Sequence, residues 1–144
     1  MGATPGRNVR RKVVTQLPET ERVILDELST PVSHYAHAVR AGNLVFISGV
    51  VATDKEGNVV GPGDPVAQTR QIFRNIQLLL DRFQAGPQHI VKVTVYLRNM
   101  EDRPRVNTVR EEYFGVHRPA STLVEITKLI DPALLVEIDA TAVL

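Results

Sequence analysis

The sequence predicts an α+β domain in which two amphipathic helices cover one face of a β-sheet. The chain has 144 residues, the usual size of one domain, and 43% of them are hydrophobic, which suffices for a core. Only 5% are aromatic, so Val, Ile and Leu must fill that core, and this composition favours β structure. Several short strand-like runs also accompany two longer stretches with helical periodicity. We expect this domain to span residues 21–144, after a flexible basic N-terminal extension at 1–20.

Strand signals dominate the chain before the first helix. Apolar or β-branched runs bounded by Pro, Gly or Asn indicate strands at Arg22–Leu28, Ser33–Val39 and Leu44–Ala52, a hairpin arm at Val59–Val60, and an optional strand at Arg11–Leu17. The run Leu44–Ala52 is almost continuously apolar, which predicts a buried strand. Gly49 within it indicates a bulge or a close backbone approach.

Asp64 and Pro65 mark the start of the first helix. A carboxylate caps free backbone N–H groups, and Pro fits the first helical position. Apolar side chains then recur every three or four residues as far as Phe83, which predicts a helix from about 65 to 84. The run Ile90–Leu97 alternates as a half-buried strand does: one side carries Lys92, Thr94 and Tyr96, and the other carries only apolar residues.

A second helix is predicted to have Pro104 in its first turn and to end at Gly115, which is placed as its C-cap. Its apolar stripe consists of Val106, Val109, Tyr113 and Phe114. Two strands complete the domain: one at about 121–126, after the turn at Pro119, and a last one at Leu134–Val143.

Charge and cysteine content exclude several classes of function. The chain has 17 basic and 16 acidic residues, so neither nucleic acid nor membrane is an expected partner. It contains no Cys, which excludes a thiol nucleophile, a disulfide framework and a thiolate metal site. No apolar run approaches the length of a membrane span, and no signal-peptide core is present, so we expect a cytoplasmic protein.

The ordered set of short motifs along residues 33–143 resembles the RidA/YjgF family of reactive-intermediate deaminases. The matching segments are Asn43–Gly49, Gln68-Thr69, Asn75-Ile76, Val91–Leu97, Val106-Asn107, Tyr113-Phe114, Pro119-Ala120 and Val136–Ile138. The resemblance implies a chorismate-mutase-like fold, with one mixed sheet and both helices on one face. It further implies a homotrimeric barrel with substrate clefts between subunits. It also implies hydrolysis of 2-imino and 2-enamino acids to 2-keto acids and ammonia without a metal or an organic cofactor.

The same resemblance assigns roles to five residues. Tyr35 resembles the tyrosine that closes over the substrate, and Ser48 and Gly49 resemble the Ser-Gly pair whose backbone lines the pocket. Asn107 resembles an asparagine on the second helix near the cleft. Glu137 resembles the glutamate that positions or activates a water. We therefore expect Glu137 and Tyr35 to be the catalytic residues.

The residue most diagnostic of the family's deaminases is absent from this sequence. Where the family has Pro-Ala-Arg-Ser, with an Arg that clamps the substrate carboxylate, this sequence has Ser121. Arg118 is a candidate substitute clamp, although a plain surface position is the alternative. The missing Arg puts the substrate in doubt but not the fold.

Four further residues are candidates for the cleft. His34, His37 and His117 are candidate proton donors or hydrogen-bonding groups. His34 and His37 point to opposite faces of a strand, so we expect no metal site from them. Phe114 is a candidate binding residue, with a place in the core as the alternative.

These observations lead to three hypotheses of different classes. The first is a cofactor-independent hydrolase, a RidA-like deaminase acting on a small imine, enamine or related molecule, in which Glu137 handles the water. The second is a non-catalytic trimer of the same fold that binds a small molecule or has a regulatory role. The third is an endoribonuclease-like translation inhibitor, which the near-neutral charge favours least.

Overall fold

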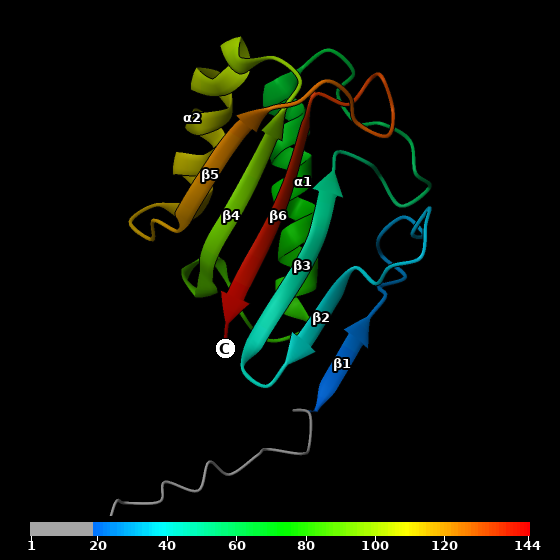
Figure 1. Ribbon diagram of the computed structural model, residues 1–144, viewed down its shortest axis with the longest axis vertical. Helices are drawn as coiled ribbons and strands as arrows, with labels where there is room; N and C mark the ends of the chain where they lie inside the picture. Colours follow the sequence, from blue (N-terminus) through cyan, green and yellow to red (C-terminus); the bar gives the residue numbers. More distant parts are fainter. Residues whose placement is uncertain (1–18) are drawn as a thin grey trace, which may run out of the picture.

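A six-stranded mixed sheet forms the body of the protein, as Figure 1 shows for a computed structural model that describes residues 19–144. The strand order is β1-β2-β3-β6-β4-β5. The strands are β1 (Thr20–Val23), β2 (Ala38–Ala41), β3 (Leu44–Val51), β4 (Ile90–Leu97), β5 (Ala120–Glu125) and β6 (Val136–Val143). All neighbours are antiparallel except β4 and β5, which run parallel. Most of the predicted N-terminal extension and the whole of the optional strand at 11–17 lie outside the described residues.

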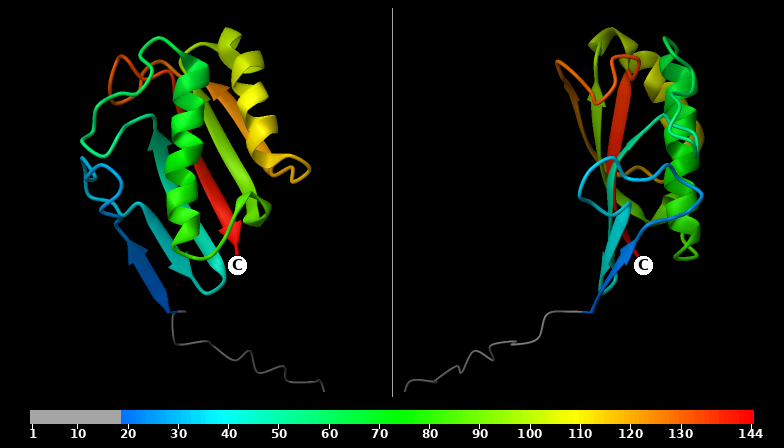
Figure 2. Two further views of the ribbon diagram at one scale, coloured as in Figure 1. Left: turned by 180° about the vertical axis from the view of Figure 1, so that it is seen from behind. Right: turned by 90° about the vertical axis from the view of Figure 1, so that its right-hand side faces the viewer.

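Two α-helices, α1 (Pro65–Asp81) and α2 (Arg103–Phe114), pack against the same face of this sheet (Figure 2). As predicted, Asp64 caps α1: its Oδ1 accepts hydrogen bonds from the backbone N–H groups of Val66 and Ala67 at 3.0 and 3.1 Å. The α2 helix ends at Gly115, whose φ of 55° favours glycine. Short 3₁₀ turns, η1 (Pro87–His89) and η2 (Met100–Asp102), precede β4 and α2.

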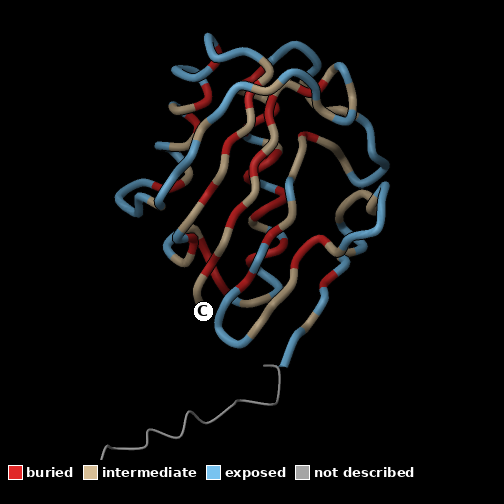
Figure 3. Tube along the Cα trace, viewed as in Figure 1, coloured by how far each residue is buried: buried red, intermediate tan, exposed pale blue. Residues whose placement is uncertain are grey.

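The core lies between the helices and the middle strands. Figure 3 shows buried residues gathered along β4 and β6, whereas β5 and the loops are largely exposed. Four fully buried side chains of α1 pack here: Ile72, Ile76, Leu79 and Leu80. The buried Gln68 ties two loops to α1: its Nε2 donates to the carbonyls of Gly61 and Ala133, and its Oε1 accepts from the N–H of Leu135. These bonds fix the loop that leads into β6.

The face of the sheet opposite the helices is open. Here the prediction of a fully buried strand at 44–52 was wrong. Val45 and Ile47 are buried beneath α1, whereas Leu44 and Phe46 are 37% and 47% exposed on the open face. Side chains alternate along a strand, and the helices cover only one face, so half of β3 has no cover within one copy of the chain.

Three other strand predictions also need correction. The strand predicted at Arg22–Leu28 ends at Val23, because residues 26–28 form a turn. The strand predicted at Ser33–Val39 begins only at Ala38. The predicted hairpin arm is reduced to an isolated bridge between Thr53 and Val59. Three strands therefore precede α1 instead of four, and a long loop over residues 24–37 takes the remaining length.

Candidate functional site between the open sheet face and its loops

A β-bulge lies at the centre of the candidate site. The register of β3 against β6 shifts between Ile47 and Val50, where Ser48 and Gly49 together oppose Asp139. The sequence predicted this irregularity from Gly49. Bulges bend a strand and redirect its side chains, and this one turns the backbone of Gly49 toward the neighbouring strand.

The carboxylate of Glu137 lies directly against that bulge. Glu137 pairs with Val51 across the β3–β6 ladder and is half-buried. An added Cβ on Gly49 would overlap Oε1 of Glu137 and lie 2.9 Å from its Cδ, so only glycine leaves room for the carboxylate. Burial, and then the negative charge of Asp139, raise the pKa of Glu137 above its ordinary value. A carboxylate of this kind can take a proton from water and return it.

An open cleft of about 730 Å³ surrounds this carboxylate. Besides residues of three loops, its lining includes four residues that the sequence analysis assigned to the site: Tyr35, Ser48, Gly49 and Glu137. The loop that carries Tyr35 is fastened to β3, because the Ser48 hydroxyl donates to the carbonyl of Ala36 at 2.7 Å and the Ser48 N–H donates to the carbonyl of His37 at 3.0 Å. Ser48 thus holds Tyr35 at the cleft.

Two apolar side chains at this cleft are strongly exposed. Val32 is 78% exposed and Ile130 is 75% exposed, and both line the cleft. Exposed apolar groups around a concave surface are typical of a place where another molecule binds.

His37 fastens the loop through both of its ring nitrogens. It is buried, its Nδ1 accepts a hydrogen bond from the N–H of Leu25, and its Nε2 donates to the carbonyl of Ser29, both at 3.0 Å. Both ring nitrogens are therefore occupied. His34, by contrast, is exposed and does not line the cleft around Glu137.

Replacing His37 by Ala is therefore expected to lower the free energy of unfolding by about 1–3 kcal/mol, because two partly buried backbone groups lose their partners. Urea unfolding followed by circular dichroism measures this change. The exposed His34→Ala variant is the matched control and should stay within about 0.5 kcal/mol of the wild type. Equal stabilities for the two variants would contradict the role given to His37.

A second cluster of assigned residues lies at the edge strand β5. Ser121 pairs with the buried Val93, so its side chain faces the helix layer, where Asn107 lies on α2. Arg110 joins the two: its Nη2 donates to Ser121 Oγ at 2.7 Å and its Nη1 donates to Asn107 Oδ1 at 3.2 Å. Arg110 is not among the site residues predicted from the sequence. Its position three residues after Asn107 on a helix was the available signal.

The two clusters do not meet within one copy of the chain. Glu137 pairs with Tyr96, and its side chain lies on the open face of the sheet. Ser121 lies on the helix side, and the whole of β4 separates β5 from β6. Any site that uses both clusters must therefore combine two copies.

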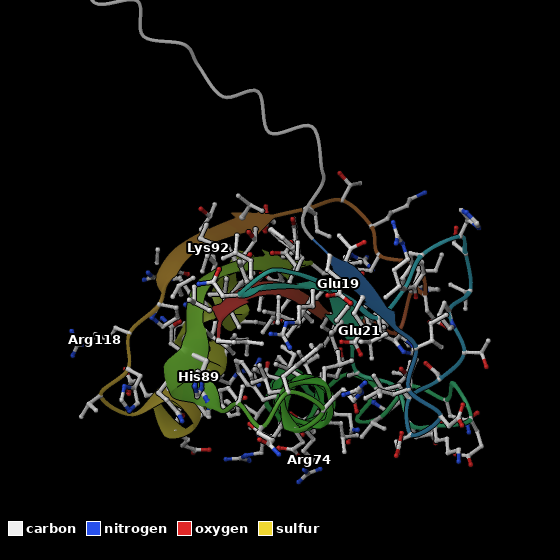
Figure 4. The ribbon with its side chains drawn as sticks, turned by 90° about the horizontal axis from the view of Figure 1, so that it is seen from below. Glu19, Glu21, Arg74, His89, Lys92 and Arg118 are labelled. Atoms are coloured by element: carbon white, nitrogen blue, oxygen red, sulfur yellow. The ribbon has the colours of Figure 1, made fainter. Side chains whose placement is uncertain are left out.

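The remaining candidates lie elsewhere. Arg118 is exposed on the loop before β5, and Figure 4 shows it pointing outward from the molecule. His117 is exposed on the same loop. Phe114 is 5% exposed and makes edge-to-face contacts with Phe73 and Tyr113, with ring centroids 5.5 and 5.1 Å apart, so it packs in the core.

The described residues provide neither a metal cluster nor a membrane span. Residues 19–144 contain no group of three His, Asp or Glu side chains placed to hold a metal ion. Within the same range, no helix combines the length and the apolar character needed to cross a bilayer.

Comparison with known proteins gives a consistent picture. The chain is 36% identical to a RutC family protein of Pyrococcus horikoshii over 122 residues, covering 85% of this chain and 96% of the relative. It is 33% identical to a 3-aminoacrylate deaminase, RutC, of Acinetobacter baylyi, covering 85% of this chain and 97% of the relative. A 2-iminobutanoate/2-iminopropanoate deaminase of Dermatophagoides farinae is 30% identical, with 86% and 97% covered.

Solved structures and a family model agree with these relatives. The crystal structure of a putative endoribonuclease from Thermotoga maritima superposes with a TM-score of 0.80 at 34% identity, covering 86% of this chain and 97% of the other. The family model described as Endoribonuclease L-PSP matches residues 26–144. The mixed six-stranded sheet with two helices is thus the fold that the sequence predicted. The chain belongs to the RidA/YjgF family, whose family model bears the name Endoribonuclease L-PSP.

Proposed function

We propose that the protein hydrolyses a small imine or enamine to a carbonyl compound and ammonia, with Glu137 as the group that activates water. The observation that carries this proposal is the half-buried Glu137 carboxylate held against Gly49 in an open cleft. Two relatives are named as deaminases of 3-aminoacrylate and of 2-iminobutanoate or 2-iminopropanoate, which supports this reaction class.

The reaction requires one group that accepts and donates protons. A protonated imine carbon is electrophilic, and Glu137 takes a proton from water as the water oxygen bonds to that carbon. The resulting carbinolamine then breaks its C–N bond: the nitrogen receives the proton from Glu137 and leaves as ammonia. The hydroxyl becomes the carbonyl by giving its proton to the Glu137 carboxylate, which passes it to the departing ammonia and is ready for the next cycle. A raised pKa suits a carboxyl that must both accept and return a proton near neutral pH. Tyr35 also lines the cleft, and we assign to it the role of closing over the bound substrate.

The cleft is completed by a neighbouring copy in a homotrimer. We infer that Ser121 and Asn107 of one copy face the Glu137 cleft of the next. This arrangement would bring together two clusters that one chain keeps apart. The exposed Val32 and Ile130 at the cleft, together with Leu44 and Phe46 on the open face, supply apolar surface for such an interface. The two contacting surfaces differ, so the interface is heterologous and closes only as a ring.

The test is to generate 2-iminobutanoate or 2-aminoacrylate enzymatically in the assay and to follow release of the keto acid and ammonia. The protein should accelerate release beyond the spontaneous rate, and the sedimentation mass should be that of a trimer. No acceleration on any imine or enamine would favour the alternative, a non-catalytic trimer that binds a small molecule.

Replacing Gly49 by Ala tests the geometry of the site. The added methyl group overlaps the carboxylate and must displace it, and a misplacement of about 1 Å can lower a rate by roughly 10²-fold. We expect kcat to fall on this order in the keto-acid assay. Gly42→Ala is the control for general effects of a glycine change, because an added Cβ meets nothing within 4 Å there, although its φ of 61° adds strain. A Gly49→Ala protein with wild-type kcat would show that the Glu137 carboxylate need not lie where we place it.

A further inference from the structure

The guanidinium of Arg110 connects the other two residues of the second cluster, Ser121 and Asn107. Arg110 extends from α2 to the edge strand, where Ser121 and Asn107 each accept one hydrogen bond from a different Nη nitrogen. Each Nη carries two N–H groups, so one N–H on each remains for another acceptor. Two parallel N–H groups of this kind fit the two oxygens of a carboxylate.

The charge of Arg110 has no acidic partner among residues 19–144. The ion pairs of this part of the chain join Arg70 to Glu112, Arg82 to Glu21 and Arg105 to Asp102. Both hydrogen-bond partners of Arg110 are neutral, and its Nε is buried without an acceptor. Burial also lowers the pKa of Arg110. A half-buried cation that faces only neutral groups is costly to keep, and an anion bound beside it would offset that cost.

We propose that Arg110 binds the carboxylate of the substrate, with Ser121 and Asn107 as the residues that orient its guanidinium. This inference rests on the proposed function, because it names the substrate as an imine or enamine of an amino acid. Arg118, the substitute considered from the sequence, is exposed and points outward, and no hydrogen bond or ion pair joins its side chain to residues 19–144. In the assembled protein, Arg110 of one copy holds the carboxylate while Glu137 of its neighbour works at the adjacent carbon.

The experiment measures binding without catalysis. The probes are 2-oxobutanoate, a keto acid of the kind the reaction releases, and its neutral amide, 2-oxobutanamide, each titrated calorimetrically. We expect Arg110→Gln to bind the acid roughly 10- to 100-fold more weakly than the wild type, because it loses charge-assisted hydrogen bonds to the carboxylate. The amide should bind both proteins alike. The matched control is Arg103→Gln, an exposed Arg at the start of the same helix, which should bind the acid as the wild type does.

Two further variants keep the test decisive if Arg110→Gln folds poorly. Arg110→Lys keeps the charge but loses the planar fork, and Ser121→Ala removes one orienting acceptor. Each should weaken binding of the acid by several-fold and leave the amide unaffected. In kinetics with 2-iminobutanoate, the loss in all three variants should appear chiefly in KM.

Three results would overturn the proposal: a wild type that does not bind 2-oxobutanoate, equal binding of the acid by Arg110→Gln and Arg103→Gln, or equal losses for acid and amide. A fourth is dissociation of the assembly by Arg110→Gln while Arg110→Lys and Ser121→Ala bind the acid normally, because Arg110 would then serve the interface. A protein that binds 2-oxobutanoate through Arg110 but hydrolyses no imine would sink the proposed function and leave this inference standing.

Discussion

Glu137→Gln should lower kcat for imine or enamine hydrolysis by roughly 10²–10⁴-fold, because the amide fits the same space beside Gly49 but cannot take a proton from water. The measurement is keto-acid release at saturating substrate. Binding of 2-oxobutanoate should change little, since Glu137 does not hold the carboxylate. Glu111→Gln on the exposed side of α2 is the matched control and should retain wild-type kcat. Equal kcat for both variants would remove Glu137 from the mechanism.

The pH dependence follows from the same carboxyl. Burial and Asp139 raise the pKa of Glu137, and the reaction needs the ionised form. Activity should therefore fall as the pH drops through a value above that of an ordinary Glu. The pH dependence of folding stability has the opposite sign to that of activity. The folded protein holds this proton more tightly than the unfolded chain, so the stabilising contribution of the neutral form is present below the unfolded pKa and is lost as the pH rises through the folded pKa.

That linkage has a measurable consequence at neutral pH. Glu137→Gln should unfold at a higher temperature than the wild type, although it is inactive, and the difference should shrink as the pH falls below the ordinary pKa of a Glu. Thermal unfolding across a pH series measures this gap. A gap that grows toward low pH would mean that the carboxylate is stabilised by its site instead of strained there.

Mixing two impaired variants should restore activity, because each cleft draws Glu137 and Arg110 from different copies. In a ring assembled at random from equal amounts of Glu137→Gln and Arg110→Gln chains, about one cleft in four combines two intact halves. The mixture, refolded together and assayed at substrate well below KM, should therefore reach about a quarter of the wild-type kcat/KM, which is more than either variant reaches alone.

The two variants refolded separately and combined afterwards are the control for simple dilution. If the mixed assembly is no more active than this control, and sedimentation confirms that the chains have mixed, the site lies within one copy. That result would contradict the two-copy cleft while leaving the role of Glu137 open to its own test.

The parts of the fold that the sequence predicted well are those with local physical signals. Asp64 and Pro65 marked the start of α1, strict alternation gave the bounds of β4, and Gly115 ended α2, because capping and periodicity act within a few residues. Residues 24–28 and 33–37 were predicted as parts of two strands but fold as a loop. Its backbone groups bond to the side chain of His37, a partner up to 12 residues away that no local pattern reveals.

The candidate site shows the same division. The family resemblance pointed to Glu137, Gly49 and Tyr35, and they line one cleft. Arg110 could not be predicted because a lone Arg on a helix normally lies in solvent. Its contact with Ser121 depends on how α2 packs over β5. The separation of the two clusters depends on the strand order β6-β4-β5, which the sequence does not display.

The most direct test of the two-copy hydrolase site is a crystal structure of the assembled protein with 2-oxobutanoate bound. We expect the carboxylate of the ligand to accept hydrogen bonds from both Nη nitrogens of Arg110 in one copy. The ketone carbon should then lie beside the Glu137 carboxylate of the neighbouring copy, within reach of one water. A keto acid bound away from Glu137, or a cleft that remains open to solvent with no neighbour contributing to it, would contradict the account.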